Sequence, residues 1–247
     1  MNFDESAQQR YARQLALPEI GAAGQAKLAA ARLLLVGVGG LGSPAGFYLA
    51  AAGIGTLGLA DGDRLDLSNL QRQIAHTTAD VGRLKVESAA RTFQALNPAV
   101  QIRQHAERLT EVNAGALLRD YDFVIDATDN FESKYLIAAA CHAADKPYSH
   151  AGILRFFGQT LTVLPGQTAC YRCVFADPPP PPTPAVGPLG VVPGVIGTIQ
   201  AAEAIKFVTG AGKLLTNRLL TFDALTMQFR EIAVRRNAAC PLCGKIS

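Results

Sequence analysis

A glycine-rich segment and a later acid have the residue types and spacing of a nucleotide site. Residues 37–42, GVGGLG, fit the pattern G-x-G-x-x-G between an apolar run and a helix-forming segment. Backbone N–H groups in such a loop can approach a phosphate at the positive end of a helix. Asp61 follows the next apolar run, where a carboxylate can accept hydrogen bonds from both ribose hydroxyls. The pattern predicts a ligand that contains adenosine, whereas a glycine-rich packing turn would leave Asp61 as a coincidence.

Amides and cations downstream of Asp61 indicate which adenosine ligand binds. The glycine pattern alone points first to a dinucleotide, and so to an oxidoreductase. The following segment, however, contains Asn69, Gln71, Arg72, Gln73 and Lys85. Two cations suit a triphosphate, whose charge must be neutralised as a phosphorus–oxygen bond breaks, whereas hydride transfer needs no such pair. The alternative is that these cations solvate a surface loop, and Asp63 and Asp66 are as readily explained as solvated loop acids.

Two further acids, Asp126 and Asp129, follow an apolar run at residues 123–125. Open α/β sheets bind ligands at the carboxyl ends of such strands. Asp129 could therefore hold a magnesium ion that bridges phosphates. Asp126 has an alternative explanation, as a cap of the next helix or an acceptor of turn amides.

Four of the five cysteines form two C-x-x-C pairs, Cys170 with Cys173 and Cys240 with Cys243. Four thiolates are what a structural zinc ion requires, and they leave no open position for chemistry. The 66 residues between the pairs mean that the metal would tie the late part of the chain to an earlier region. Two redox dithiols are the alternative, but the flanking residues do not supply the context for thiols of low pKa. Cys141 lies in an apolar helical segment and is expected to be a small buried residue.

Composition limits the class of protein. The chain has 247 residues, 49% hydrophobic and 17% charged, and a net charge of +3. These values predict a globular protein and give no support for a nucleic-acid or membrane partner. The uncharged stretch 33–60 is long enough to cross a bilayer, but its glycines and Pro44 argue against a membrane helix. Few cysteines and an acidic N-terminus favour a cytoplasmic protein with reduced thiols.

Apolar runs and turn residues predict an α/β fold with a Rossmann-like, mostly parallel sheet and flanking helices. We expect an N-terminal helical cap at 1–31 and a nucleotide-binding half at 32–147. In that half, strands are expected at 32–37, 56–60, 100–105 and 123–126, and helices at 43–53, 82–96, 110–120 and 132–144. A smaller mixed region at 148–247 should contain strands at 148–152, 158–164, 218–223 and 227–234, a helix at 195–209 and an exposed Pro-rich crossover loop at 178–193. All of these parts are expected to form a single domain.

Nine segments together resemble the adenylating enzymes of the ubiquitin-activating superfamily, of the ThiF, MoeB and HesA type. They are RYARQ at 10–14, GVGGLGSP at 37–44, DGDRLDLSNLQRQ at 61–73, VGRLKVESA at 81–89, DATDN at 126–130, CYRC at 170–173, GVIGTIQAAEAIK at 194–206, FDALTMQFR at 222–230 and CPLC at 240–243. The resemblance covers nearly the whole chain. It is strongest to bacterial enzymes that adenylate small ubiquitin-like sulfur carriers for molybdopterin or thiamine-thiazole biosynthesis.

The resemblance implies a reaction between ATP and the C-terminal Gly-Gly of the carrier. The glycine carboxylate attacks the α-phosphorus, giving an acyl-adenylate and pyrophosphate. A terminal carboxyl with a pKa of about 3.5 is already ionised at pH 7, so no general base is needed. The implied site residues are Gly40 under the nucleotide, Asp61 on the ribose, Arg72 and Lys85 on the phosphates, and Asp129 on Mg²⁺ and the reacting phosphate, with Asp63 and Asn69 completing the nucleotide site.

The resemblance also implies partners. Arg13 matches an arginine that reaches the site of a partner subunit, which implies a homodimer. The crossover loop lacks the cysteine that many relatives use for covalent transfer, so we expect the enzyme to stop at the acyl-adenylate and a separate sulfurtransferase to deliver sulfur. The missing cysteine favours the molybdopterin branch. The alternatives are the thiamine-thiazole or another carrier, or a non-catalytic module that binds a ubiquitin-like protein.

Overall fold

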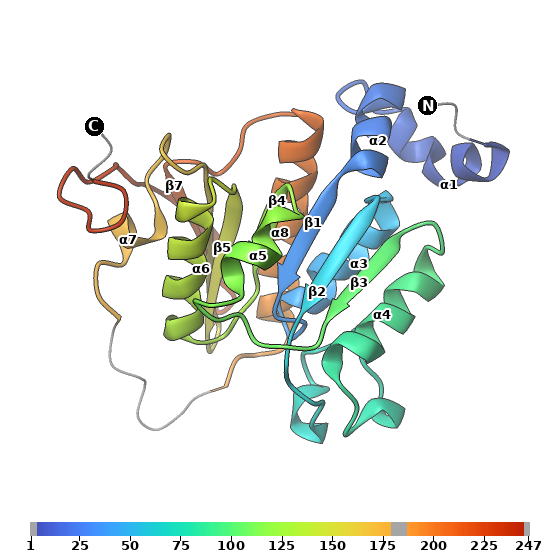
Figure 1. Cartoon of the computed structure of the whole chain (residues 1–247), viewed down its shortest axis with the longest axis horizontal. Helices are drawn as coiled ribbons and strands as arrows, with labels where there is room; N and C mark the ends of the chain where they lie inside the picture. The colour runs from blue at the N-terminus through green and yellow to red at the C-terminus, as the bar shows by residue number, and fades with distance from the viewer. Residues whose placement is uncertain (1–3, 179–186, 245–247) are drawn as a thin grey trace.

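The computed structural model describes residues 4–178 and 187–244. The strands of these residues belong to one continuous mixed sheet. Its strands follow the order β3-β2-β1-β4-β5-β6-β7-β8 (Figure 1). The parallel strands are β1 (Arg32–Val36), β2 (Thr56–Ala60), β3 (Gln101–His105), β4 (Phe123–Asp126) and β5 (Tyr148–Leu154). The antiparallel strands are β6 (Phe157–Val163), β7 (Arg218–Asp223) and β8 (Gln228–Ala233). Because β5 pairs in parallel with β4 and antiparallel with β6, the smaller mixed region extends the same sheet.

Helices cover both faces of the sheet (Figure 1). One face packs against α2 (Gly21–Ala30), α3 (Gly42–Ala52), α4 (Lys85–Leu96) and α8 (Val191–Thr209). The other packs against α5 (Ala114–Arg119), α6 (Phe131–Ala143) and the short α7 (Tyr171–Val174). Leu33 and Leu35 of β1 enter the first core, and Leu34 and Val36 enter the second. This burial on both faces explains why β1 is a continuous apolar run.

The predicted α/β class and mostly parallel sheet are confirmed, and the differences are local. The uncharged stretch 33–60 folds as β1, α3 and β2 rather than as a membrane helix. Helix α8 begins at Val191, inside the segment predicted as the crossover loop, because Pro193 lies in the first turn, where a helix tolerates proline. The first turn of the predicted helix 110–120 is instead a loop, in which the Asn113 side chain accepts the N–H of Thr110 and the Thr110 hydroxyl accepts the N–H of Asn113. Most of the Pro-rich run, residues 179–186, lies outside the described residues.

Helix α8 is long and apolar enough to cross a membrane by length and composition alone. In the structure it packs against α3 and against β5 and β6, and nearly half of its most apolar window is buried. It is therefore a core helix that joins the parallel part of the sheet to the antiparallel part.

The two ends of the parallel strands carry different parts of the chain (Figure 1). The glycine-rich segment and Asp61 follow β1 and β2, so they lie at the carboxyl edge of the sheet. Helix α1 (Glu5–Leu15) lies at the opposite edge, where Arg10 donates to the carbonyl of Leu96 at the end of α4.

Candidate functional site

The glycine-rich loop makes a tight turn from β1 into α3. Gly37 has φ +90°, in the region that favours glycine. A Cβ on Gly42 would lie 2.1 Å from the carbonyl oxygen of Gly37. A Cβ on Gly40 would lie 3.3 Å from Cγ of Arg72 and from Cβ of Pro193 in α8. The loop thus places bare backbone at the carboxyl edge, directly beside Arg72.

Asp61 braces this loop. One carboxylate oxygen accepts the N–H of Val38 at 2.9 Å, and the other accepts the N–H of Asp63 at 2.9 Å. Each carboxylate oxygen has a second lone pair, so the side chain can still accept hydrogen bonds from a ligand. Asp61 is only half-buried, which leaves it accessible to a ribose.

Asp63 joins two cations in a group that we call the β2 cluster, made of Asp63, Lys85 and Arg108. Its carboxylate lies 3.1 Å from Nζ of Lys85 and 2.8 Å from Nη2 of Arg108. Hydrogen bonding to Arg108, and then to Lys85, holds the pKa of Asp63 below its usual value. The Lys85 side chain is 9% exposed and that of Arg108 is 80% exposed, so one cation is enclosed and the other faces solvent.

Arg108 was not among the predicted site residues. Asp63 raises the pKa of its guanidinium most, and Asp61 and Asp129 add to this effect, so all three acids lie near Arg108. The prediction of a strand at 100–105 could have pointed to this residue. A segment that follows β3 emerges at the same edge as the segments that follow β1 and β2.

The loop between β2 and α4 carries Asn69, Arg72 and Gln73. The Asn69 side chain accepts the N–H of Asp66, and Arg72 donates to the carbonyl of Ser68 at 3.2 Å. Gln73 is buried, and its Nε2 would lie 3.4 Å from a Cβ on Gly39. Asn69 therefore shapes the loop, while Arg72 and Gln73 lie against the glycine segment.

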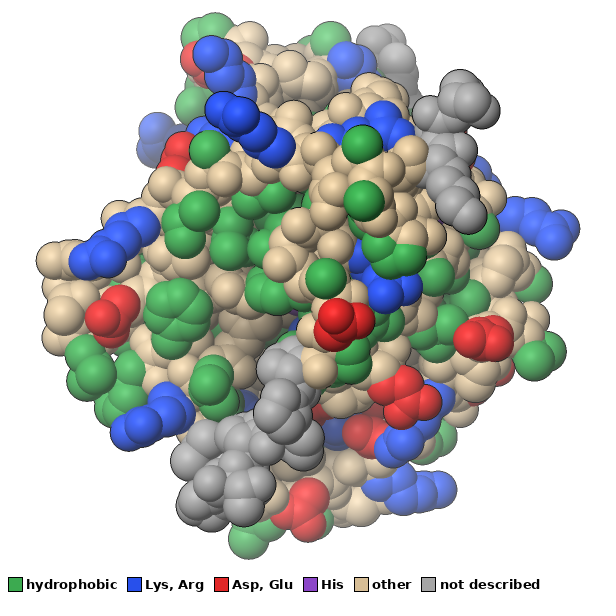
Figure 2. All heavy atoms as spheres, turned by 90° about the vertical axis from the view of Figure 1, so that its left-hand side faces the viewer, with side chains coloured by type: hydrophobic (Ala, Val, Ile, Leu, Met, Phe, Trp, Pro, Cys, Tyr) green, Lys and Arg blue, Asp and Glu red, His purple; other side chains and the backbone are tan. Residues whose placement is uncertain are grey.

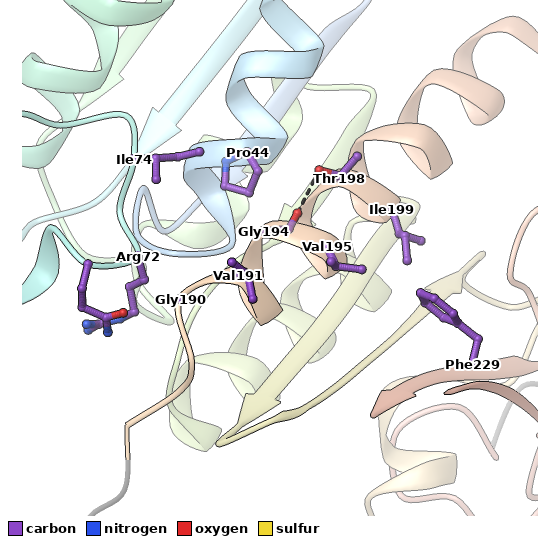
Figure 3. Close-up of a pocket in the computed structure, with 11 residues that line it drawn as sticks. Pro44, Arg72, Ile74, Gly190, Val191, Gly194, Val195, Thr198, Ile199 and Phe229 are labelled. Atoms are coloured by element: carbon purple, nitrogen blue, oxygen red, sulfur yellow. Dashed lines mark hydrogen bonds between the residues drawn. The ribbon is translucent and has the colours of Figure 1, made fainter. Parts of the chain in front are cut away.

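A cavity of about 590 Å³ opens beside Arg72 (Figure 3). Arg72 and Ile74 lie on one side, Val191 and Val195 of α8 lie in the middle, and Phe229 of β8 lies on the far side. Most of the lining is apolar. The cavity connects the surroundings of the glycine loop with the antiparallel end of the sheet.

The two acids at the end of β4 have different surroundings: Asp126 is the last residue of the strand, and Asp129 follows it. Asp129 is exposed, whereas Asp126 is fully buried. Asp126 accepts hydrogen bonds from the Thr128 hydroxyl at 2.6 Å and the Thr128 N–H at 3.1 Å, as the turn-amide alternative predicted. Asp126 therefore holds the turn after β4 in place, and Asp129 is the acid that is exposed to solvent and to a ligand.

Asp126 also forms what we call the β4 cluster with Lys134 and His150. Its carboxylate lies 3.3 Å from Nζ of Lys134 and 2.9 Å from Nδ1 of His150. Burial alone would raise its pKa, but Lys134 and His150 together lower the pKa of Asp126 to about 2. Lys134 also donates to the carbonyls of Thr128 and Ala151, which fixes the turn that carries Asp129.

Arg13 is not brought to this site by its own chain. It is exposed on α1, at the edge of the sheet opposite the glycine loop (Figure 1). Neighbouring residues fix α1 there, since Asn97 donates to both the Tyr11 hydroxyl and the carbonyl of Ala50.

The four paired cysteines meet on the α6 face of the sheet. Their sulfur atoms all lie within 4.8 Å of one another. The separations are 3.8 Å for Cys170 and Cys173, 3.6 Å for Cys170 and Cys240, and 3.3 Å for Cys173 and Cys243. Zinc–sulfur bonds of about 2.3 Å in a tetrahedron place sulfurs about 3.8 Å apart, so the four thiols fit a zinc ion. Cys141 is separate and fully buried in α6, as predicted, and burial raises the pKa of its thiol.

Comparison with known families and proteins gives matches over almost the full length. The model of the ThiF family matches residues 11–242. A sulfur carrier protein adenylyltransferase of Thermus thermophilus is 45% identical over 253 aligned positions, which cover 99% of this chain and 93% of that protein. A probable adenylyltransferase/sulfurtransferase, MoeZ of Mycobacterium tuberculosis, is 44% identical over 94% of this chain.

The length of the match differs between relatives. The chain spans 61% of MoeZ and 53% of the adenylyltransferase and sulfurtransferase MOCS3 of Bos taurus. Among solved structures, Escherichia coli MccB with ATP superimposes with a TM-score of 0.84 at 23% identity, over 98% of this chain and 76% of MccB. At this level of sequence identity, the similarity to MccB shows a shared fold.

Proposed function

The chain belongs to the ThiF family, and from this premise we propose that it adenylates the C-terminal glycine carboxylate of a small ubiquitin-like sulfur carrier, with ATP as the second substrate. One observation carries the proposal. The glycine loop, Asp61, Lys85 and Arg72 converge at the carboxyl edge of the parallel strands. That arrangement combines a phosphate cradle, a ribose acceptor and two cations, as transfer of an adenylyl group requires.

The proposed reaction is a displacement at the α-phosphorus of ATP. A carboxylate oxygen of the carrier forms a bond to that phosphorus, and the bond from the phosphorus to the oxygen bridging toward the β-phosphate breaks. Pyrophosphate leaves with the electron pair, and the carrier becomes an acyl-adenylate. No proton must move, because the carboxylate is ionised at pH 7. The protein therefore acts by positioning the reactants and neutralising charge.

The cations of the site have separable tasks in this proposal. Arg72, beside Gly40, binds phosphate oxygens, and Lys85 moves from Asp63 toward the negative charge of the triphosphate. Asp129 would hold Mg²⁺, since an exposed carboxylate supplies one oxygen ligand and leaves the remaining positions to phosphates and water. When bound, Mg²⁺ would neutralise phosphate charge.

Arg13 enters the proposal through a second copy of the chain. The glycine loop of the same chain lies at the opposite edge of the sheet, so Arg13 can contact only the nucleotide site of a second copy (Figure 1). We therefore propose a homodimer in which each site is completed by the partner's α1.

The antiparallel end of the sheet is the proposed docking region for the carrier. Leu225, Met227, Phe229 and Ile232 on and before β8 are each more than half exposed. Figure 2, which views the molecule from this end, shows hydrophobic side chains gathered around a hollow. An apolar cavity runs from Phe229 to Arg72, so a slender Gly-Gly tail could reach the glycine loop through it. This would make 148–247 the carrier-binding half of one adenylation domain.

The carrier proposed is the small subunit of molybdopterin synthase, in a cytoplasmic pathway. The absence of a cysteine from residues 178–194 supports an enzyme that stops at the acyl-adenylate. Sulfur would then come from a separate sulfurtransferase. The cysteine centre would hold a structural zinc ion, because four protein ligands leave no position for a substrate.

Carrier-dependent exchange of pyrophosphate into ATP tests the proposal. Purified protein, ATP, Mg²⁺ and candidate carriers ending in Gly-Gly should give exchange, and a carrier lacking its last glycine should give none. Absence of exchange with every Gly-Gly carrier would contradict adenylation. Nicotinamide dinucleotide binding under the same conditions would favour an oxidoreductase instead.

A further inference from the structure

His76 contacts the glycine loop at a point that the proposed reaction does not yet use. Its Nε2 lies 2.9 Å from the carbonyl oxygen of Val38. The backbone N–H of Val38 donates to the carboxylate of Asp61. Val38 is therefore held on both sides, by the acid that would bind ribose and by a histidine.

We propose that His76 is a positioning residue for the nucleotide, which holds the glycine loop in the shape that binds phosphate. This inference rests on the proposed function and deepens it. Val38 lies between Gly37 and Gly39, where the backbone must stay fixed for its N–H groups to face a phosphate. Glycine-rich backbone has many alternative conformations, so an external tether has a large effect on it.

Hydrogen-bond chemistry determines which form of His76 does this. A carbonyl oxygen only accepts, so Nε2 must carry the hydrogen. The other ring nitrogen, Nδ1, lies 3.0 Å from the hydroxyl of Ser88. Burial lowers the pKa of His76, which favours the neutral ring. With the hydrogen on Nε2, Nδ1 of the neutral ring is an acceptor, and the Ser88 hydroxyl can donate to it and hold the ring in place.

Ser88 also connects this contact with the phosphate-binding cation. Ser88 and Lys85 are both buried on α4, three residues apart, and thus on the same side of the helix. His76 consequently links three segments, the glycine loop, its own loop and the helix that carries Lys85. A displacement of His76 would alter the distance between the phosphate cradle and Lys85.

The experiment measures ATP binding without a carrier, in His76→Leu and His76→Gln. Leucine fills the space but donates nothing, whereas the glutamine amide can replace Nε2–H as the donor to Val38. We expect the Kd for ATP to rise about 10-fold in His76→Leu, as expected for one lost buried hydrogen bond, and less than about 3-fold in His76→Gln. Ser88→Ala, which keeps the Nε2–H donor but removes the hydrogen bond that holds Nδ1, should give a Kd between those of the two His76 variants.

Thr162→Val is the matched control, because it removes a buried hydrogen bond from Thr162 in β6 to Glu203 in α8, away from the glycine loop. It should lower thermal stability and leave the Kd for ATP unchanged. Should His76→Leu bind ATP as tightly as the wild type, or should glutamine fail to rescue it, the positioning role is wrong. If His76→Leu does not fold, the Kd values of the other three proteins decide. The wild type should bind ATP most tightly, His76→Gln next and Ser88→Ala least tightly, and a Ser88→Ala variant that binds as tightly as the wild type would contradict the positioning role. If the wild type itself does not bind ATP, the proposed function is wrong. If the wild type binds ATP but the variants do not follow the expected order, only the role of His76 is wrong.

Discussion

The β2 cluster and the β4 cluster contain the same kinds of residue in different surroundings. In each cluster one aspartate lies between two basic side chains, near the carboxyl ends of the parallel strands. The Asp63 carboxylate is 44% exposed, whereas that of Asp126 is 1% exposed. The two lysines are both enclosed, at 9% exposure for Lys85 and 6% for Lys134, so the difference lies in the acids. The acid beside the proposed nucleotide site stays accessible, whereas the acid that shapes the backbone is buried.

The largest expected effect concerns the stability of the β4 cluster. Lys134→Met leaves Asp126 buried with one cationic partner fewer, so we expect the free energy of unfolding to fall by about 3 kcal/mol. Denaturant unfolding followed by circular dichroism measures this. Lys85→Met is the matched control and should destabilise less, because Asp63 can turn to solvent and to Arg108. Equal losses in both variants would contradict the distinction between the clusters.

The second prediction concerns catalysis by the β2 cluster. In Lys85→Ala, carrier-dependent pyrophosphate exchange should fall on the order of 100-fold or more, because one cation no longer neutralises the transferring phosphate. Zinc content should stay the same, since the cysteine centre is on the α6 face. Retention of wild-type exchange by Lys85→Ala would mean that this lysine only solvates the loop. Arg72→Ala should give a loss of similar size.

The third prediction is a pH dependence of stability from Asp126. Its pKa is about 2 in the folded chain and about 3.9 when unfolded, so its contribution is present above pH 4. The contribution should be lost as the pH falls from about 4 to about 2, and it amounts to roughly 2 to 3 kcal/mol. Unfolding free energies across this range should therefore decline more steeply in the wild type than in Asp126→Asn. Parallel declines would show that Asp126 is not preferentially ionised in the folded chain.

The smallest effect is expected at Arg108. Its guanidinium is mostly exposed, and solvent weakens an ion pair of this kind. Arg108→Ala should raise the KM for ATP only about 2- to 5-fold, with kcat almost unchanged, as expected for loss of an exposed charge near the nucleotide. Steady-state exchange at varied ATP concentrations separates the two parameters. A large loss of kcat would instead place Arg108 on the reacting phosphates.

The fold was largely predictable because its signals are local. The apolar run at 33–36 followed by glycines predicts a buried strand that ends in a glycine-rich turn, and the structure has both. The paired cysteines predict a shared centre, and their sulfurs converge. The start of α8 was less clear, because Pro193 reads as a loop residue until the helix around it is known.

The less predictable part of the site depends on contacts between distant segments. Nothing in the sequence near His76 indicates that it lies against Val38, 38 residues earlier, or that Ser88 orients its ring. Arg108 reaches Asp63 only because β3 pairs with β2 in the observed register. Such contacts follow from the arrangement of strands, so a motif search along the chain does not detect them.

The brace formed by Asp61 has a kinetic consequence. It joins the loop after β1 to the turn after β2 through hydrogen bonds that the chain makes with itself. A nucleotide would therefore meet a cradle that is already ordered, and little chain entropy would be lost on encounter. We expect its association to be limited by diffusion and charge attraction, and differences between nucleotides to appear as differences in residence time.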